Sequence, residues 1–167
     1  FPLIGAGIPE KAREMMDHNL EKVKELEAKM VVFSCPSCYR TWKESYDTDL
    51  ELLHSTQLIE KLIRDGSIRL KEVNTTVTYH DPCDLGRNGG IYDAPRKILK
   101  SIPGLTFLEL ENNRAQSVCC GGGGNLEMVD SGLTETMAQK KIGEIQRTGV
   151  KTVVTSCQQC IRTIKAR

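Results

Sequence analysis

Apolar and polar residues follow two different periods along this chain. Between residues 9 and 29, apolar side chains recur at Met16, Leu20 and Val23, which is the spacing of one stripe of an amphipathic helix. The short apolar run Met30–Phe33 is instead typical of a buried strand. The same criteria predict further strands at 76–79, 105–110 and 151–155, and further helices at 39–46, 52–65, 95–101, 134–147 and at the C-terminal end.

Helices that alternate with short strands are typical of an α/β domain, and we expect a mainly parallel sheet flanked by helices. Cysteines follow three of the predicted strands, at Cys35, Cys83 and Cys157. Open sheets of this class bind their ligands outside the carboxyl ends of the strands. The predicted fold and the cysteine positions therefore point to one functional edge.

Charge and composition exclude several classes of protein. The 23 Lys and Arg residues nearly balance the 22 Asp and Glu residues, and aromatic residues make up only 5%. Neither a basic surface nor a set of stacking aromatic rings is available for nucleic acid, so we expect no nucleic-acid partner. No apolar run approaches the ~18 residues of a membrane span, so we expect no direct membrane insertion.

Seven cysteines are the unusual feature of the composition. An odd number excludes a fully paired set of intrachain disulfides, and a chain of this length does not need disulfides to fold. Two Cys-x-x-Cys pairs and one adjacent pair suggest thiolates that converge on a metal. We therefore expect a reducing compartment, most simply the cytoplasm.

An internal repeat relates the two Cys-x-x-Cys pairs. Residues 29–43 align with residues 151–165 at a constant offset, and nine of the fifteen positions are identical. We therefore predict that residues 1–50 are the C-terminal part of a first, truncated repeat and that residues 51–167 are a complete second repeat. In that arrangement Cys35 and Cys38 are the last pair of a cysteine set whose other members lie upstream.

The complete unit has a specific cysteine spacing: Cys83, then 35 residues, Cys119-Cys120, then 36 residues, and Cys157-x-x-Cys160. Together with the segments 79–87 (Tyr-His-Asp-Pro-Cys-Asp-Leu-Gly-Arg) and 119–124 (Cys-Cys-Gly-Gly-Gly-Gly), this pattern resembles the cysteine-rich (CCG) domain found in the B and D subunits of heterodisulfide reductases. The same domain occurs in iron–sulfur subunits of glycolate and lactate oxidases. Asp84 departs from the pattern, because many relatives have His there.

The resemblance implies Rossmann-like CCG units with cluster loops at the strand ends. It implies an iron–sulfur cluster, [4Fe-4S] or a non-cubane variant, and an oxidoreductase subunit that passes electrons through it to reduce a disulfide. The implied metal ligands are Cys83, Cys119, Cys120, Cys157 and Cys160, with Cys35 and Cys38 as possible ligands of a second cluster completed upstream. Gly121 and Gly122 would bind the cofactor, because glycine lets the backbone approach sulfur closely and offers N–H donors.

Implied partners are other redox subunits of flavin, ferredoxin or membrane cytochrome type, with membrane association only through such a partner. The implied substrate is a small thiol or disulfide, or a hydroxy acid. Two alternatives stay open: an electron-relay subunit of a glycolate- or lactate-type oxidase, and a structural zinc module built on Cys157 and Cys160 with two further ligands.

Several other polar residues have two interpretations. His80, directly before the Cys83 loop, either tunes or protonates the cluster, as a possible catalytic group, or caps a turn. His18 and His54 are expected on helix surfaces. Arg87 and Arg96 either bind an anionic substrate or fix the loop.

Overall fold

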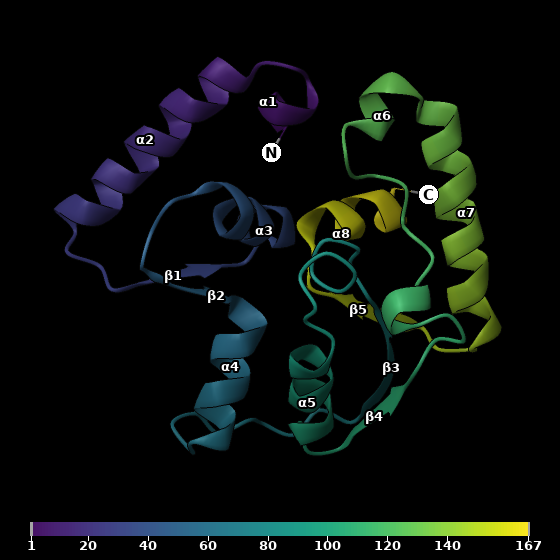
Figure 1. The fold of residues 1–167 in the computed structure, drawn as a ribbon. Coiled ribbons are helices and arrows are strands. Elements are labelled where there is room, and N and C mark those ends of the chain that lie inside the picture. The colour runs from purple at the N-terminus through teal and green to yellow at the C-terminus, as the bar shows by residue number, and fades with distance from the viewer. Residues whose placement is uncertain (1, 167) are drawn as a thin grey trace.

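The structure, a computed structural model, describes residues 2–166 as a chain of alternating helices and short strands (Figure 1). The strands are β1 (Met30–Phe33), β2 (Glu51–His54), β3 (Thr75–His80), β4 (Leu105–Leu108) and β5 (Thr152–Thr155). The helices are α1 (Pro2–Gly5), α2 (Pro9–Glu25), α3 (Pro36–Ser45), α4 (Ser55–Arg64), α5 (Asp93–Ser101), the 3-10 turn η1 (Arg114–Gln116), α6 (Leu126–Val129), α7 (Ser131–Arg147) and α8 (Gln158–Lys165).

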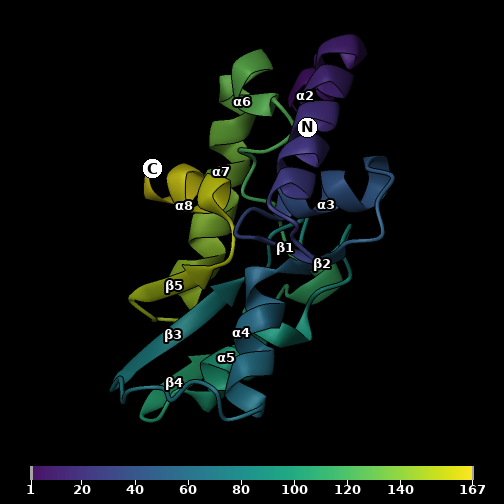
Figure 2. The same ribbon diagram turned by 90° about the vertical axis from the view of Figure 1, so that its left-hand side faces the viewer.

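The strands form two small sheets, and every pairing is parallel. β1 pairs with β2, while β3 lies between β4 and β5 in the second sheet. In the second sheet, helix α5 lies against β4 and α8 lies against β5, with α7 beside α8. Helices α3 and α4 lie against β1 and β2 of the first sheet (Figures 1 and 2). The predicted α/β class with parallel pairing is thus confirmed.

The predicted helix at 52–65 is wrong at its beginning. Residues Glu51–His54 form β2, and the helix α4 begins only at Ser55. Leu52 and Leu53 fit the apolar stripe of the following helix, so periodicity gives no break between the two elements. The expectation that His54 lies on a helix surface is also wrong. His54 is fully buried, and its ring caps α4 by accepting a hydrogen bond from the backbone N–H of Thr56.

A shared hydrophobic core joins the two sheets. Phe33, Tyr39 and Trp42 come from the β1–α3 unit, and they pack with Leu85 and Ile91, which come from the loop after β3. A second core lies under the β4–β3–β5 sheet and contains Val77, Tyr79 and Leu99. Because Leu85 follows Cys83 by two residues, the packing that joins the two halves also fixes the loop of this cysteine.

The division of the chain at residues 50 and 51 stays a prediction, and its outer ends, residues 1 and 167, lie outside the described residues. The pairing of β1 with β2 attaches residues 51–54 to the sheet of the N-terminal part. A repeat boundary in the exposed connection at residues 65–74 agrees better with this pairing.

Candidate metal centre

Each cysteine-bearing segment lies at the carboxyl end of a strand or in an adjoining loop. Cys157 follows β5 and is the N-cap residue of α8, and Cys35 has the same position between β1 and α3. Cys83 lies three residues beyond β3, and the adjacent pair Cys119-Cys120 lies in the loop between η1 and α6. The parallel topology brings these segments to one edge of the molecule, as the sequence predicts.

The thiols of five cysteines interact with one another in series, and two of them are in direct contact. The Sγ atoms of Cys120 and Cys160 are 3.3 Å apart. Cys119 interacts with Cys83 on one side and with Cys120 on the other. Cys157 interacts with Cys160 at the opposite end. Segments more than 70 residues apart in the sequence, those of Cys83 and Cys160, thus contribute thiols to one group.

The thiols in this group differ in pKa: some have a pKa below the ordinary value for cysteine, and others have a pKa above it. Interactions with Cys120 and Cys83 lower the pKa of Cys119. The interaction with Cys119, together with burial, raises the pKa of Cys83, and contacts with Cys120 and Cys157 raise the pKa of Cys160. Since metals bind thiolates, a metal ion has to displace protons here, and its affinity rises with pH.

Backbone amides point at the sulfurs of the group. The N–H of Gly121 donates to Cys119 Sγ at 3.4 Å, and the backbone of Gly122 interacts with the Cys120 thiol and lowers its pKa, although the contact with Cys119 raises that pKa to about 11 overall. Such donors favour the anionic form of a thiol. The Cys160 thiol lowers the pKa of Cys157 to about 7, and the backbone N–H groups of Cys160 and Gln159, at the N-terminus of α8, add to this effect.

The two glycines after the cysteine pair are also required by packing. A Cβ atom at Gly121, whose φ is +83°, would lie 2.8 Å from Met137 Cβ, and one at Gly122 would overlap the Thr163 hydroxyl. The close approach that the sequence predicts for these glycines is therefore an approach to α7 and α8. Both helices hold the cysteine loop against the site.

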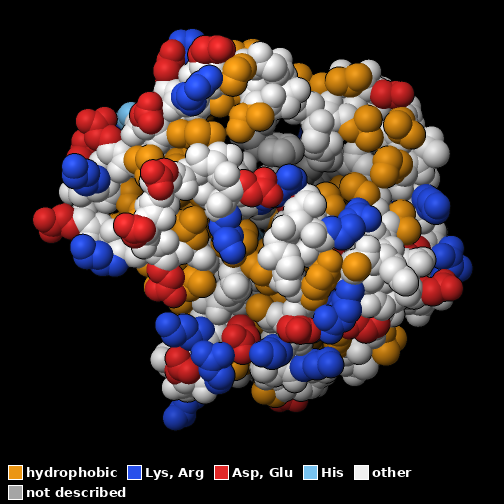
Figure 3. Space-filling model, viewed as in Figure 1, with side chains coloured by type: hydrophobic (Ala, Val, Ile, Leu, Met, Phe, Trp, Pro, Cys, Tyr) orange, Lys and Arg blue, Asp and Glu red, His pale blue; other side chains and the backbone are white. Residues whose placement is uncertain are grey.

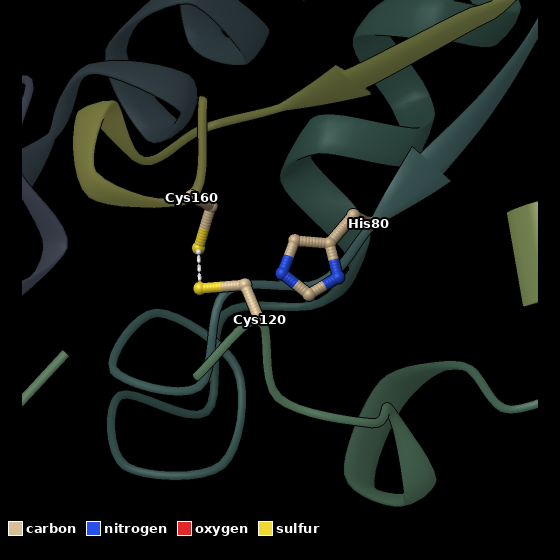
Figure 4. Close-up of side chains that lie close together, drawn as sticks. All are labelled: His80, Cys120 and Cys160. Carbon is tan, nitrogen blue, oxygen red and sulfur yellow. Dashed lines mark hydrogen bonds between the residues drawn. The ribbon is translucent and has the colours of Figure 1, made fainter. Parts of the chain in front are cut away.

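His80 lies behind the sulfur group, at the end of β3. Its side chain is 1% exposed, and one of its ring nitrogens lies within 4.8 Å of the Sγ atoms of Cys120 and Cys160 (Figure 4). Neither ring nitrogen has a hydrogen-bond partner among the described residues. Burial and the nearby ammonium of Lys141 lower the pKa of His80 to about 4, so the ring is neutral at pH 7. A turn-capping role is not supported, because a cap requires a hydrogen bond.

Arg96 fixes the loop of Cys83. Its guanidinium is buried and donates to both carboxylate oxygens of Asp81, at 2.7 and 2.8 Å, and to both oxygens of Glu109. Asp81 also accepts from the backbone N–H of Arg114 at 2.8 Å. The hydrogen bonds of Arg96 therefore fix the loop of Cys83, which is one of the two roles expected for it. Arg87 lies on the surface.

The second Cys-x-x-Cys pair is separate from the five-thiol group but tied to it. The backbone N–H of Cys38 donates to Cys35 Sγ at 3.3 Å. Asp84, next to Cys83, accepts a hydrogen bond from the Ser37 hydroxyl at 2.5 Å and forms an ion pair with Arg40 at 3.2 Å. Asp84 therefore has a definite partner set here, although it departs from the family pattern.

A cavity of about 740 Å³ adjoins both sets of thiols. Its cysteine lining comprises Cys35, Cys38, Cys83, Cys120, Cys157 and Cys160. Apolar side chains, among them Leu3, Met16 and Trp42, line much of the rest. Figure 3 shows a hollow at the top of this face, between the α1–α2 arm and α6, with hydrophobic side chains around it. The sulfurs thus adjoin a largely apolar chamber.

The donor set fits an iron–sulfur cluster. Five thiols that interact in series exceed the four ligands of a structural zinc site, and thiolate is the ligand on which iron–sulfur clusters depend. The amides of Gly121 and Gly122 supply donors for sulfur, and the orphaned ring of His80 leaves one more polar group without a partner among the described residues.

Within residues 2–166, no helix is both long enough and apolar enough to cross a membrane.

Comparison with known proteins identifies the same pattern. The chain is 33% identical over 164 residues to the D subunit of the dihydromethanophenazine:CoB–CoM heterodisulfide reductase of Methanosarcina barkeri, in an alignment that covers 94% of this chain and 40% of the relative. It is 35% identical to the B subunit of the fumarate reductase (CoM/CoB) of Methanothermobacter marburgensis, over 98% of this chain and 33% of the relative. An uncharacterised iron–sulfur protein of Methanococcus maripaludis is 34% identical over 95% of this chain and 31% of the relative.

The chain therefore spans 40% or less of the length of these relatives. The sequence profile of the cysteine-rich domain, CCG, matches residues 1–43 and 77–165, and this match includes all seven cysteines. The chain belongs to the cysteine-rich (CCG) domain family.

Proposed function

We propose that this chain is part of an iron–sulfur oxidoreductase of the heterodisulfide reductase type. Cys83, Cys119, Cys120, Cys157 and Cys160 hold an iron–sulfur cluster, [4Fe-4S] or non-cubane, and the substrate is a small disulfide. The series of interactions that links these five thiols, with Cys120 and Cys160 in contact, is the observation that supports this proposal. Relatives named as iron–sulfur proteins and as reductase subunits support it.

The cavity favours a substrate-binding role over simple electron relay. A relay subunit needs a cluster near the surface, but it needs no chamber beside the cluster. Here a volume of about 740 Å³ adjoins the thiols, and much of its lining is apolar. Pockets of this size and character are typical of small-molecule sites. A cluster held by the five thiolates would supply one-electron transfer to and from a bound molecule.

The protein's own groups prepare the site for that chemistry. The amides of Gly121 and Gly122 stabilise negative charge on the sulfurs of Cys119 and Cys120. Apolar side chains such as Met16 and Trp42 line the chamber, and an apolar lining strengthens these electrostatic effects. Cys35 and Cys38 line the same chamber, and we propose them as ligands of a second cluster that is completed by other parts of the protein.

Partners and compartment follow from the same proposal. Electrons have to reach the cluster from another redox group, of flavin, ferredoxin or cytochrome type, on a partner subunit. Two of the relatives are named as subunits, which supports such an assembly. All seven cysteines are free thiols, which suits the reducing cytoplasm.

Anaerobic metal analysis and electron paramagnetic resonance test the proposal. We expect iron and acid-labile sulfide, and a paramagnetic signal that changes when a thiol or disulfide is added. Cys120→Ser should abolish the signal of this cluster. Cys38→Ser is the matched control, since it removes an exposed thiol of the other pair and should leave this signal unchanged.

The alternatives predict different results. Zinc without iron or sulfide in the anaerobic protein would support a structural module and contradict the proposal. An iron–sulfur signal that does not respond to any thiol, disulfide or hydroxy acid would support a relay subunit instead. A Cys120→Ser variant with an unchanged signal would contradict the five-ligand assignment.

A further inference from the structure

The ring of His80 is a buried polar group that the described residues leave without partners. It is 1% exposed, and both of its ring nitrogens lack a hydrogen bond within residues 2–166. A neutral imidazole has one N–H donor and one acceptor. Because buried polar groups are nearly always paired, an orphaned ring beside a cofactor site indicates that the cofactor supplies the missing partner.

The position of the ring identifies that partner. One ring nitrogen faces the sulfurs of Cys120 and Cys160 and lies within 4.8 Å of both (Figure 4). His80 is absent from the described residues that line the cavity, whereas both of these cysteines are present. The ring therefore approaches the sulfurs from the protein side, where a substrate does not reach it.

The charged groups near the ring are paired with one another and not with the ring. Lys141 is fully buried nearby, and its ammonium pairs with the carboxylate of Glu144 at 2.5 Å. Glu144 is occupied further by the backbone N–H of Asn112, at 2.8 Å. No carboxylate of the described residues forms a hydrogen bond with the ring of His80.

We infer that His80 is a tuning residue, whose ring N–H donates a hydrogen bond to the thiolates of Cys120 and Cys160 in the bound cluster. This inference rests on the proposed function. Hydrogen bonds to cluster sulfurs stabilise the reduced, more negative state and so raise the reduction potential. His80 then sets the driving force of electron transfer without contacting the substrate.

Substitution with a potential measurement tests the inference in the anaerobic, cluster-containing protein. In His80→Ala, we expect the equilibrium constant for cluster reduction to fall about tenfold, which corresponds to about 59 mV for a one-electron couple. His80→Gln retains an N–H donor and should recover part of the loss. Thr78→Val is the matched control, because Thr78 is buried two residues earlier on β3 and its hydroxyl has no partner among the described atoms. It should leave the potential unchanged.

A spectroscopic measurement on the unmodified protein covers the case in which the variants fail to fold. The chain has three histidines, so ¹⁵N-histidine labelling with electron–nuclear double resonance is selective. We expect one weakly coupled nitrogen and an exchangeable proton attached to it.

Three results would overturn the inference. They are an unchanged potential in a cluster-containing His80→Ala variant, the absence of any histidine coupling, and a strong nitrogen coupling that indicates direct ligation of iron. Metal analysis separates these results from failure of the proposed function, because a protein without iron and sulfide contradicts both.

Discussion

Gly122 illustrates how a single residue serves both packing and chemistry. The sequence places it after two candidate metal ligands, which suggests a role toward the cofactor. In the structure, a side chain at this position would overlap the Thr163 hydroxyl and lie 2.7 Å from Gln159 Nε2, both on α8. The helix that begins after Cys157 is thereby held against the loop that contains Cys119 and Cys120.

We expect Gly122→Ala to destabilise the protein by about 1–3 kcal/mol, the usual cost of overpacking a tight contact. Gly123→Ala is the control, because a Cβ atom there has open space around it and Gly123 is exposed. The free energy of unfolding, from chemical denaturation of the metal-free protein, measures both. Equal effects of the two substitutions would contradict the packing argument.

Among the helices and strands, most were predicted from the sequence, and the misses have physical reasons. Met30–Phe33 forms a strand as predicted, since a short apolar run is flanked there by a helix end and a cysteine turn. The strand Glu51–His54 was missed because it passes directly into α4 without a glycine or proline between them. Local periodicity cannot separate two adjoining elements when the apolar residues of both fit one pattern.

At the site, too, the sequence predicts the features that depend on local spacing but not those that depend on the three-dimensional fold. The cysteine spacing predicts five thiols as ligands of one site, which stays a prediction; the structure places Cys120 and Cys160 in contact and gives the other three thiols interactions with their neighbours in the series. The sequence did not predict that Lys141 is fully buried, because a lysine in a charged helix normally lies on a solvated face. The orphaned state of His80 could not be predicted either, since it depends on the three-dimensional absence of partners among the described residues.

The ion pair between Arg96 and Asp81 joins helix α5 to the end of strand β3. Both side chains are buried, and Asp81 is two residues before Cys83. We expect Asp81→Asn to destabilise the protein by about 3 kcal/mol, because it leaves part of a buried guanidinium charge uncompensated. Thermal and chemical unfolding measure the loss.

Asp93→Asn is the matched control for this prediction. Asp93 also pairs with an arginine, Arg114 at 2.7 Å, but both side chains are largely exposed. Exposed pairs contribute less than about 1 kcal/mol. A similar loss of stability in the two variants would show that Arg96 is not the structural anchor of the Cys83 loop.

Across the whole molecule, two hydrogen bonds connect the corner between β1 and α3 to the corners that follow β3 and β5. Asp84, after Cys83, accepts from Ser37, which lies between Cys35 and Cys38. In the other direction, the Gln158 side chain, next to Cys157, donates to the backbone oxygen of Ser34 at 2.9 Å. Both hydrogen bonds therefore hold the corner that contains Cys35 and Cys38 against the cysteine-bearing corners of the second sheet.

We expect Asp84→Ala to loosen α3 relative to the second sheet, because Ser37 and Arg40 both lose an acceptor. Hydrogen exchange of the α3 amides should accelerate about tenfold, which corresponds to about 1.4 kcal/mol of local stability. Glu44→Gln is the control, since Glu44 is the exposed partner of Arg40. Unchanged exchange in Asp84→Ala would contradict a mechanical link between the corners.

The shared core has a consequence for the integrity of the polypeptide. Leu85 and Ile91 pack among Phe33, Tyr39 and Trp42, whereas the connection around Arg69 and Lys71 is exposed. Trypsin should therefore be able to nick the protein between α4 and β3 without separating the fragments. The two fragments should co-migrate in native gel filtration and separate only in denaturant, because the shared core holds them together without a covalent link.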